Sequence, residues 1–301
     1  MDVGVIGVGT MGKNHVRVYS ELKSVDTVHV FDVNTAGARA IGEQHGAVVH
    51  SAIAGLLDAV DAVSVCVPTP LHTSVVREVF RQKRSVLIEK PLAATAAEAT
   101  ELMRSAPPGI VIGVGHIERF NPIVGEIKKI IRNPLYVEMK RHNPASARVT
   151  GSTVVEDLMI HDIDILLTLF GEPAELHSAG TADVCSVLMK CENLPVSLSA
   201  SRKSSKKIRM IYIEEEDFTI EGDFMAQEVT IYRKPGQYQF EAERYVQENI
   251  IEKVMVNRLE PLKRELGTFI DCVSENSPFP ITPDQAISNL KVCERILADL
   301  N

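Results

Sequence analysis

The first 118 residues alternate between short apolar runs and amphipathic stretches. Five runs are rich in β-branched residues with little polar alternation, which is typical of parallel strands buried on both faces. They are Val3–Ile6, Thr27–Phe31, Ala62–Val67, Ser85–Ile88 and Ile110–Val114. Helical periodicity predicts the helices Met11–Leu22, Thr35–His45, Leu71–Gln82 and Thr95–Arg104. This alternation predicts an α/β fold with a doubly wound parallel sheet over residues 1–118.

From Pro134 onward the pattern changes to strand-like runs separated by turn residues. These runs are Leu135–His142, Glu175–Thr181, Val184–Lys190, Val196–Ser201, Ile208–Glu214, Phe218–Glu221 and Val229–Tyr232. One helix is predicted at Val155–Phe170, and two close the chain at Leu259–Cys272 and Pro283–Leu300. An antiparallel meander with a covering helix indicates a second, α+β domain over residues 119–301.

Composition restricts the class of protein. The chain has 301 residues and a formal net charge of −8, with 45% hydrophobic and 24% charged residues. The negative charge argues against nucleic acid or an anionic membrane as the main partner. Five scattered cysteines without a CxxC pair argue against a disulfide framework or a thiolate zinc site, and fit a reducing cytoplasm. We expect no signal peptide and no membrane span.

A glycine motif joins the first predicted strand to the first predicted helix. It comprises Gly7, Gly9, Thr10, Met11 and Gly12. The first glycine permits a tight turn, the second lets a pyrophosphate approach the backbone, and the third lets the helix pack on the strand. Asp32 ends the second strand, where an acid accepts from ribose hydroxyls and repels a 2′-phosphate. The series predicts NAD rather than NADP; the alternative is a glycine turn beside an ordinary surface aspartate.

Pro68, Thr69 and His72 follow the third predicted strand. Open α/β sheets bind ligands beyond the carboxyl ends of their strands, so these residues are expected to line the cofactor cleft. The equally weighted alternative is that the prolines of this segment only stop a strand and start a helix.

Glu89, Lys90 and Pro91 end the fourth predicted strand. The residue before a proline favours extended backbone, so the pair Lys90–Pro91 should form a fixed bend that points the lysine into the cleft. Desolvation and a neighbouring positive nicotinamide would disfavour the ammonium form, which suits a general acid or base. Strand alternation sends the Glu89 side chain to the other face. The alternative is a solvated lysine at a strand end.

The predicted helix Val155–Phe170 carries a polar stripe. Asp157, His161, Asp164 and Thr168 follow helical spacing and share one face, while the remaining surface is nearly all apolar apart from Asp162. Buried polar groups need partners, which a hydroxyl-bearing substrate would supply. Asp157 is expected to hydrogen-bond His161. The alternatives are a satisfied polar network between domains and a metal ion shared by Asp157 and His161.

Together these motifs resemble the Gfo/Idh/MocA family, the glucose–fructose oxidoreductase and inositol dehydrogenase relatives, across essentially the whole chain. The motifs are Gly7–Gly12, Pro68–His72, Glu89–Pro91, Gly115–Pro122 and Asp157–Asp164. The resemblance implies an N-terminal Rossmann domain and a C-terminal domain with a large, mainly antiparallel open sheet. It also implies NAD(P), a sugar or cyclitol substrate, and a homodimer or homotetramer formed through that sheet. By motif it assigns Lys90, Asp157 and His161 as catalytic, and it brings Glu89 close to the nicotinamide.

Within the family, Gly115–Pro122 and Ile160–Asp164 look most like members that oxidise the C3 hydroxyl of UDP-N-acetylglucosamine. Expected substrate-binding residues are His116, Arg119, Asn121, Arg141, Arg148 and Asp164. The two arginines of segment 141–148 could pair with a diphosphate or be solvated. That segment lacks the proline-rich form expected in such members. Free aldoses, inositols, other nucleotide sugars and an NAD-binding regulator without turnover therefore stay open. The basic run 202–207 is interpreted as a solvated turn.

Overall fold

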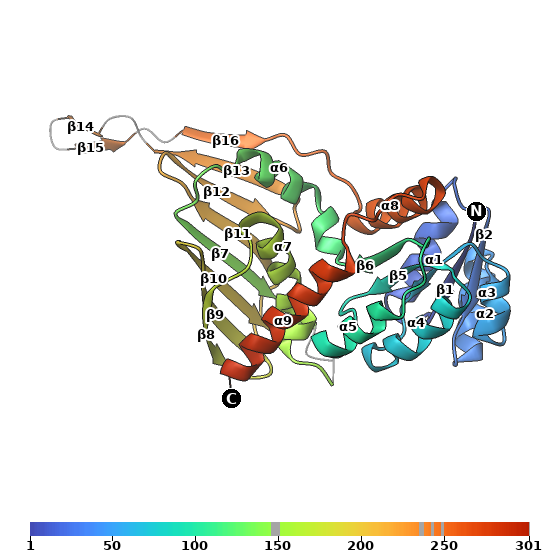
Figure 1. Ribbon diagram of the computed structural model, residues 1–301. Coiled ribbons are helices and arrows are strands. Elements are labelled where there is room, and N and C mark those ends of the chain that lie inside the picture. Colours follow the sequence, from blue (N-terminus) through green and yellow to red (C-terminus); the bar gives the residue numbers. More distant parts are fainter. Residues whose placement is uncertain (146–150, 235–237, 242–243, 248–249, 301) are drawn as a thin grey trace. The chain divides into compact units, whose positions relative to one another are not determined.

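The computed structural model describes the chain apart from residues 146–150, 235–237, 242–243, 248–249 and 301. It divides into two compact units (Figure 1). The first unit comprises Met1–Phe120 and Glu260–Lys291, and the second comprises Asn121–Leu259 and Val292–Asn301.

A six-stranded parallel sheet forms the centre of the first unit, in the order β3-β2-β1-β4-β5-β6. Its strands are β1 (Asp2–Ile6), β2 (Thr27–Phe31), β3 (Val48–Val49), β4 (Ala62–Val65), β5 (Ser85–Glu89) and β6 (Ile112–Gly115). The chain grows outward from β1 in one direction and then from β4 in the other, so the crossover helices lie on opposite faces. The predicted doubly wound sheet is confirmed.

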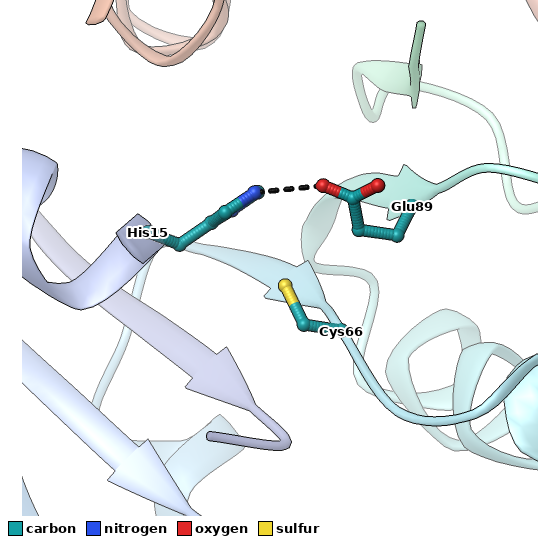
Figure 2. A group of neighbouring side chains, drawn as sticks. All are labelled: His15, Cys66 and Glu89. Atoms are coloured by element: carbon teal, nitrogen blue, oxygen red, sulfur yellow. Dashed lines mark hydrogen bonds and ion pairs between the residues drawn. The ribbon is translucent and has the colours of Figure 1, made fainter. Parts of the chain in front are cut away.

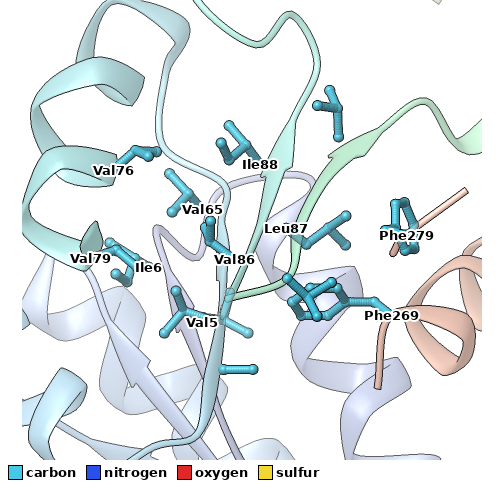
Figure 3. Close-up of a cluster of buried hydrophobic side chains, with 14 of the residues drawn as sticks. Val5, Ile6, Val65, Val76, Val79, Val86, Leu87, Ile88, Phe269 and Phe279 are labelled. Atoms are coloured by element: carbon cyan, nitrogen blue, oxygen red, sulfur yellow. The ribbon is translucent and has the colours of Figure 1, made fainter. Parts of the chain in front are cut away.

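The helices of the first unit follow these strands. They are α1 (Gly12–Glu21), α2 (Thr35–His45), α3 (Ile53–Asp58), the 3-10 helix η1 (Thr69–Leu71), α4 (His72–Arg81), α5 (Ala96–Arg104), the 3-10 helix η2 (Ile117–Phe120), α8 (Pro261–Glu275) and the first part of α9 (Pro283–Asp299). The sheet interior is apolar on both faces. Val5, Val86 and Leu87 are fully buried, as are Val76 and Val79 of α4 (Figure 3). Short β-branched runs therefore form buried strands here, as their sequence pattern predicts.

Helix α8 corrects the predicted domain division. The sequence interpretation placed all of residues 119–301 in the second domain, but α8 belongs to the first unit. Leu266, Phe269 and Ile270 are fully buried in the core of the first unit. Phe269 packs edge-on against Phe279, with ring centroids 6.0 Å apart (Figure 3). The apolar face of this helix is complementary to a sheet from which it is remote in sequence, and periodicity alone carries no information about that partner.

An eight-stranded sheet forms the second unit, in the order β16-β13-β12-β11-β7-β10-β9-β8. Its strands are β7 (Tyr136–His142), β8 (Glu175–Gly180), β9 (Val184–Cys191), β10 (Leu194–Ser201), β11 (Ile208–Glu214), β12 (Phe218–Asp223), β13 (Glu228–Arg233) and β16 (Ile250–Val254). Strands β7 and β10 pair in parallel, whereas the other neighbours pair antiparallel. A further hairpin is formed by β14 (Tyr238–Glu241) and β15 (Arg244–Gln247).

Helices cover one face of this sheet and leave the other open. In β9, Cys185, Val187 and Met189 are buried, while Val184 and Leu188 between them are exposed. The covering core includes residues of α6 (Pro122–Ile130), α7 (Ile160–Phe170) and the end of α9. The large, mainly antiparallel open sheet is thus confirmed (Figure 1). Helix α6, β16 and the hairpin were not predicted. No helix within the described ranges has the length and apolar character needed to cross a membrane.

Candidate functional site

The glycine turn after β1 is shaped for an anion. Gly7 has φ +90°, and a Cβ there would lie 2.9 Å from the Cys66 backbone. A Cβ on Gly12 would lie 1.8 Å from the Gly7 oxygen, whereas one on Gly9 would meet no described atom within 4 Å. Helix α1 begins without a side-chain cap. Lys13 and Asn14 donate their N–H groups to the Gly9 and Met11 oxygens, whereas the N–H groups of Gly9 to Gly12 have no protein acceptor among the described hydrogen bonds. The turn therefore offers backbone donors and an open approach over Gly9.

A cleft of about 570 Å³ opens beside this turn, entirely within the first unit. Ten of the eleven predicted cofactor residues line it: Gly7, Gly9, Thr10, Met11, Asp32, Pro68, Thr69, His72, Glu89 and Lys90. The eleventh, Gly12, packs under the turn against Gly7. Apolar walls come from Phe31, Val33, Ile53, Leu71 and Val75, which the sequence interpretation had not assigned to the site. Hydrophobic walls with a few convergent polar groups are the usual form of a cofactor site.

The carboxylate of Asp32 is fixed at the glycine turn. One oxygen accepts from the Val8 N–H at 2.7 Å and the other from the Asn34 N–H at 2.7 Å. Each carboxylate oxygen has a second lone pair, so the group can still accept from a ligand hydroxyl. The predicted position of this acid, at the end of β2 and beside the pyrophosphate turn, agrees with the geometry.

His72 bridges two loops at the rim of the sheet. It is 1% exposed, and its Nε2 lies 2.8 Å from the Val67 oxygen while its Nδ1 lies 2.9 Å from the Pro91 oxygen. Burial lowers the pKa of His72, against the opposing effect of the two carbonyls. The prediction that Pro68, Thr69 and His72 would be at the cleft agrees with the lining, but the ring of His72 is engaged by the protein backbone.

Lys90 stands at the predicted bend, and the Lys90–Pro91 peptide is cis. Its N–H donates to Oε2 of Glu89 at 3.2 Å. Oε1 of Glu89 accepts from Nε2 of His15 at 2.8 Å (Figure 2). Burial opposes ionisation of Glu89, but the hydrogen bond from His15 and the charges of His15 and Lys90 prevail, so the pKa of Glu89 lies below its ordinary value.

His15, Cys66 and Glu89 form a buried cluster under the cleft (Figure 2). Their potential ligand atoms lie within 4.8 Å of one another. Burial, together with the negative charge of Glu89, raises the pKa of the Cys66 thiol well above its ordinary value, so the thiol stays protonated. A neutral thiol beside a hydrogen-bonded histidine–carboxylate pair is a poor cation site. His15 was missed by the sequence interpretation; a histidine on the apolar face of α1 was the available signal.

The polar stripe of the second unit differs from its prediction. Residues Val155–Met159 form a π-helix, η4, and the α-helix begins only at Ile160. Asp157 therefore lies in the π-helix and His161 in the α-helix that follows it. Asp157 Oδ2 accepts from Nη2 of Arg202, the residue after β10, at 3.4 Å. The expected hydrogen bond between Asp157 and His161 stays a prediction.

Arg202 also corrects the interpretation of the basic run as a solvated turn. It is only 4% exposed and donates to the Ser152 oxygen at 2.8 Å and the Thr153 oxygen at 2.9 Å. These carbonyls immediately precede η4, so the guanidinium holds the start of the π-helix as well as Asp157. Charge-assisted bonds of this kind are stronger than neutral ones.

Arg141, for which diphosphate pairing and a solvated position were both open, lies in a buried ion pair. Its side chain is 1% exposed, and its Nε and Nη2 donate to Asp162 at 2.9 and 2.7 Å. The guanidinium also lies over the Phe224 ring, 5.5 Å from its centroid. Asp162 was the apparent exception in the apolar surface of the helix, and this buried pair explains it. Arg148 lies outside the described residues.

The remaining expected substrate residues are divided between the units. His116 is buried after β6, and Arg119 donates from Nη1 to Gln285 at 2.7 Å. Asn121 caps α6 by accepting from the Ile123 N–H, and it donates to the Phe224 oxygen. Asp164 is 1% exposed, and its backbone oxygen accepts from the Thr168 hydroxyl.

Known proteins with similar sequences are oxidoreductases. A family model described as an oxidoreductase family with an NAD-binding Rossmann fold matches residues 1–119. The UDP-N-acetylglucosamine 3-dehydrogenase of Acidithiobacillus ferrooxidans is 32% identical over 244 residues, covering 78% of this chain and 77% of that protein. Inositol 2-dehydrogenase 2 of Saccharopolyspora erythraea is 34% identical over 203 residues, which is 60% of this chain and 57% of that enzyme.

Solved structures extend the likeness to the whole chain. A crystal structure of the Acidithiobacillus ferrooxidans enzyme superposes with a TM-score of 0.88 at 26% identity, covering 100% of this chain and 97% of that one. Levoglucosan dehydrogenase with NADH and levoglucosan shares the fold, with a TM-score of 0.84 at 17% identity over 99% of this chain and 96% of that one. The cleft beside the glycine turn, the doubly wound sheet and the similarity to these enzymes all point to the same family. The chain belongs to the Gfo/Idh/MocA family of NAD-binding oxidoreductases.

Proposed function

We propose that this protein is a dehydrogenase that oxidises a secondary hydroxyl of a nucleotide sugar, with UDP-N-acetylglucosamine as the first candidate. The observation that carries the proposal is likeness to the Acidithiobacillus ferrooxidans UDP-N-acetylglucosamine 3-dehydrogenase over both units. An inositol or free aldose is the second candidate, because inositol 2-dehydrogenases match a smaller share of the chain.

The glycine turn and Asp32 are the proposed cofactor anchors. The N–H groups of Gly9 to Gly12 and the open side of Gly9 suit a pyrophosphate, and the fixed carboxylate of Asp32 suits ribose hydroxyls. A 2′-phosphate would meet the negative charge of Asp32, so we propose NAD rather than NADP. When bound, NAD⁺ supplies the hydride acceptor for the reaction.

Lys90 is the proposed proton acceptor. It lines the cleft at the carboxyl end of β5, where a doubly wound sheet binds its ligands. In the proposed reaction Nζ, in its deprotonated form, takes the hydroxyl proton as the substrate carbon loses its hydride, and the apolar walls limit the access of water. Asp157 and His161 are proposed to bind and orient the substrate, on the strength of the sequence motif. Arg202 would hold Asp157 in place.

The open face of the second-unit sheet is the proposed surface for a second copy. It carries exposed apolar side chains, among them Leu188 of β9, Tyr232 of β13 and Ile251 of β16. Exposed apolar groups gathered on one face are typical of an interface. We expect sedimentation as a dimer or tetramer, and Leu188→Lys should weaken it. The described cysteines are free thiols, which accords with the expected reducing cytoplasm.

Formation of NADH tests the proposed function. The purified protein is incubated with NAD⁺ and, separately, UDP-N-acetylglucosamine, UDP-glucose, myo-inositol and glucose, and absorbance at the NADH wavelength is followed. Turnover should be fastest with UDP-N-acetylglucosamine. Faster turnover with myo-inositol would favour the second candidate. Tight NADH binding without turnover on any of the four compounds would contradict the proposal and favour a regulator.

A further inference from the structure

The backbone around Lys90 is held from two directions within the first unit. On one side, the Lys90 N–H donates to Glu89, whose carboxylate is fixed by His15 at 2.8 Å. On the other side, the Pro91 oxygen lies 2.9 Å from Nδ1 of His72. The Glu89 contact lies within the same strand end, whereas His72 begins a different element, α4. His72 is therefore the described side chain that ties this bend to the loop after β4.

The two contacts of His72 cannot both be hydrogen bonds in a neutral ring. Each ring nitrogen faces a carbonyl oxygen, and a carbonyl only accepts. A neutral imidazole carries one N–H, so it donates either to Pro91 or to Val67 and presents a lone pair to the other oxygen. Burial lowers the pKa of His72, so the neutral form prevails at pH 7.

The two possible bonds have different consequences for the site. A bond to Pro91 fixes the peptide that immediately follows Lys90. A bond to Val67 fixes the residue before Pro68 and Thr69, which line the cofactor cleft. The first would affect the chemical step, and the second would affect cofactor affinity. The titratable group that acts on the ring is Glu89 at the end of β5, whose negative charge raises the pKa of His72 against the larger effect of burial.

We propose that His72 is a positioning residue that donates from Nδ1 to the Pro91 oxygen and thereby sets the position of the Lys90 side chain. The inference rests on the proposed function, in which Lys90 accepts the substrate proton. His72 itself contacts neither substrate nor reacting atoms. Misplacement of a catalytic group by about 1 Å can cost about a hundredfold in rate, so loss of this bond should lower kcat.

Two substitutions separate the bonds. The amide nitrogen of asparagine occupies nearly the position of Nδ1, so His72→Asn keeps a donor to Pro91. The amide nitrogen of glutamine reaches nearly to Nε2, so His72→Gln keeps a donor to Val67 and loses the one to Pro91. Both variants are compared with wild type for kcat, with the substrate that the NADH assay identifies, and for the dissociation constant of NADH.

The expected result is a split between the variants. His72→Asn should retain kcat within about threefold, while His72→Gln should lose about tenfold or more, with NADH affinity within about twofold of wild type. Equal losses of kcat in both variants, or a His72→Gln enzyme as fast as wild type, would overturn the inference. Parallel losses of kcat and NADH affinity would also overturn it, because they would indicate a general structural role.

Combining His72→Gln with Lys90→Ala distinguishes failure of this inference from failure of the proposed function. A residue that acts only through Lys90 has no further effect once Lys90 is gone, so His72→Gln with Lys90→Ala should match Lys90→Ala alone. An additional loss in the double variant contradicts the inference. If Lys90→Ala itself retains wild-type kcat, the proposed function fails first.

The protonation of the His72 ring can also be measured in the wild-type protein, so this test does not depend on whether His72→Gln folds. Nitrogen NMR of wild type labelled with ¹⁵N-histidine, without substrate, reports which ring nitrogen of His72 carries the hydrogen. A protonated Nδ1 supports the inference, and a protonated Nε2 overturns it.

Discussion

The polar residues predicted for the cofactor site in the first unit lie at a cleft, whereas several residues predicted for the substrate site in the second unit are engaged by other protein groups. In the first unit, Asp32 and Lys90 line the same cavity. In the second, Arg141 is paired with Asp162 and Asp157 with Arg202. A charged side chain in an apolar helix signals a partner, but it does not say whether that partner is a ligand or the protein itself.

The difference has a physical origin. The cofactor motif specifies backbone geometry, because only glycine permits the turn at Gly7 and the contact between Gly12 and Gly7. Such requirements are local and can be recognised in a short segment. The described partners of Asp157 and Asp162 are Arg202, just after β10, and Arg141 of β7, which are distant in sequence. A buried charged side chain needs a hydrogen-bonding or oppositely charged partner, but the tertiary fold decides which residue supplies that partner.

Breaking the buried pair of the second unit should produce the largest change in stability. Arg141→Met removes the guanidinium from the buried pair with Asp162, which should cost about 3–5 kcal/mol of unfolding free energy. Urea unfolding of the full chain measures the loss. Arg258→Met is the control, since Arg258 and Glu228 form an exposed pair that should contribute about 0–1 kcal/mol. Equal, small losses would mean that Arg141 is not structural and would reopen its role as a ligand residue.

Substitution of Gly12 and substitution of Gly9 in the glycine turn should affect different properties, the first stability and the second NADH binding. Gly12→Ala forces a Cβ against the Gly7 oxygen and should destabilise the fold by about 1–3 kcal/mol. Gly9→Ala has open space around its Cβ, so the thermal midpoint should stay unchanged while the dissociation constant for NADH rises by about tenfold or more. Unchanged NADH affinity in Gly9→Ala would place the pyrophosphate elsewhere.

Asp32 should determine the choice of cofactor. Removing its charge with Asp32→Ser eliminates the repulsion of a 2′-phosphate and the acceptor for ribose hydroxyls, so the preference for NAD over NADP should fall by about tenfold. The ratio of kcat/KM for the two cofactors measures it. Asp58→Ser, at an exposed position of α3, is the matched control. A ratio unaffected by Asp32→Ser would refute the assignment.

Glu89 should make a small, pH-dependent contribution to stability. Its pKa in the fold lies below the ordinary value, so ionised Glu89 stabilises the protein above the unfolded pKa of about 4.3, and this contribution is lost as the pH falls. The difference in urea midpoint between wild type and Glu89→Gln should therefore stay near its pH 7 value down to about pH 4.3 and narrow below that pH. Glu43→Gln, exposed on α2, should show no such trend. A difference that widens in acid would contradict the stated sign.

The sequence predicted most of the fold and the cofactor half of the site. Buried strands, the glycine turn and Asp32 are encoded in local pattern, and each lies where it was expected. The association of α8 with the first unit, the π-helix around Asp157 and the partner of Arg141 depend on packing between segments remote in the chain. His15 was overlooked because its partner, Glu89, lies 74 residues away.

The most direct test of the central claim is single-turnover hydride transfer in wild type and Lys90→Ala, with NAD⁺ and UDP-N-acetylglucosamine. Lys291→Ala, exposed on α9, serves as the control variant. The account predicts a rate about 10² to 10⁴ times lower in Lys90→Ala, with NADH affinity and the rate of Lys291→Ala close to wild type. A Lys90→Ala rate within a few fold of wild type would contradict it.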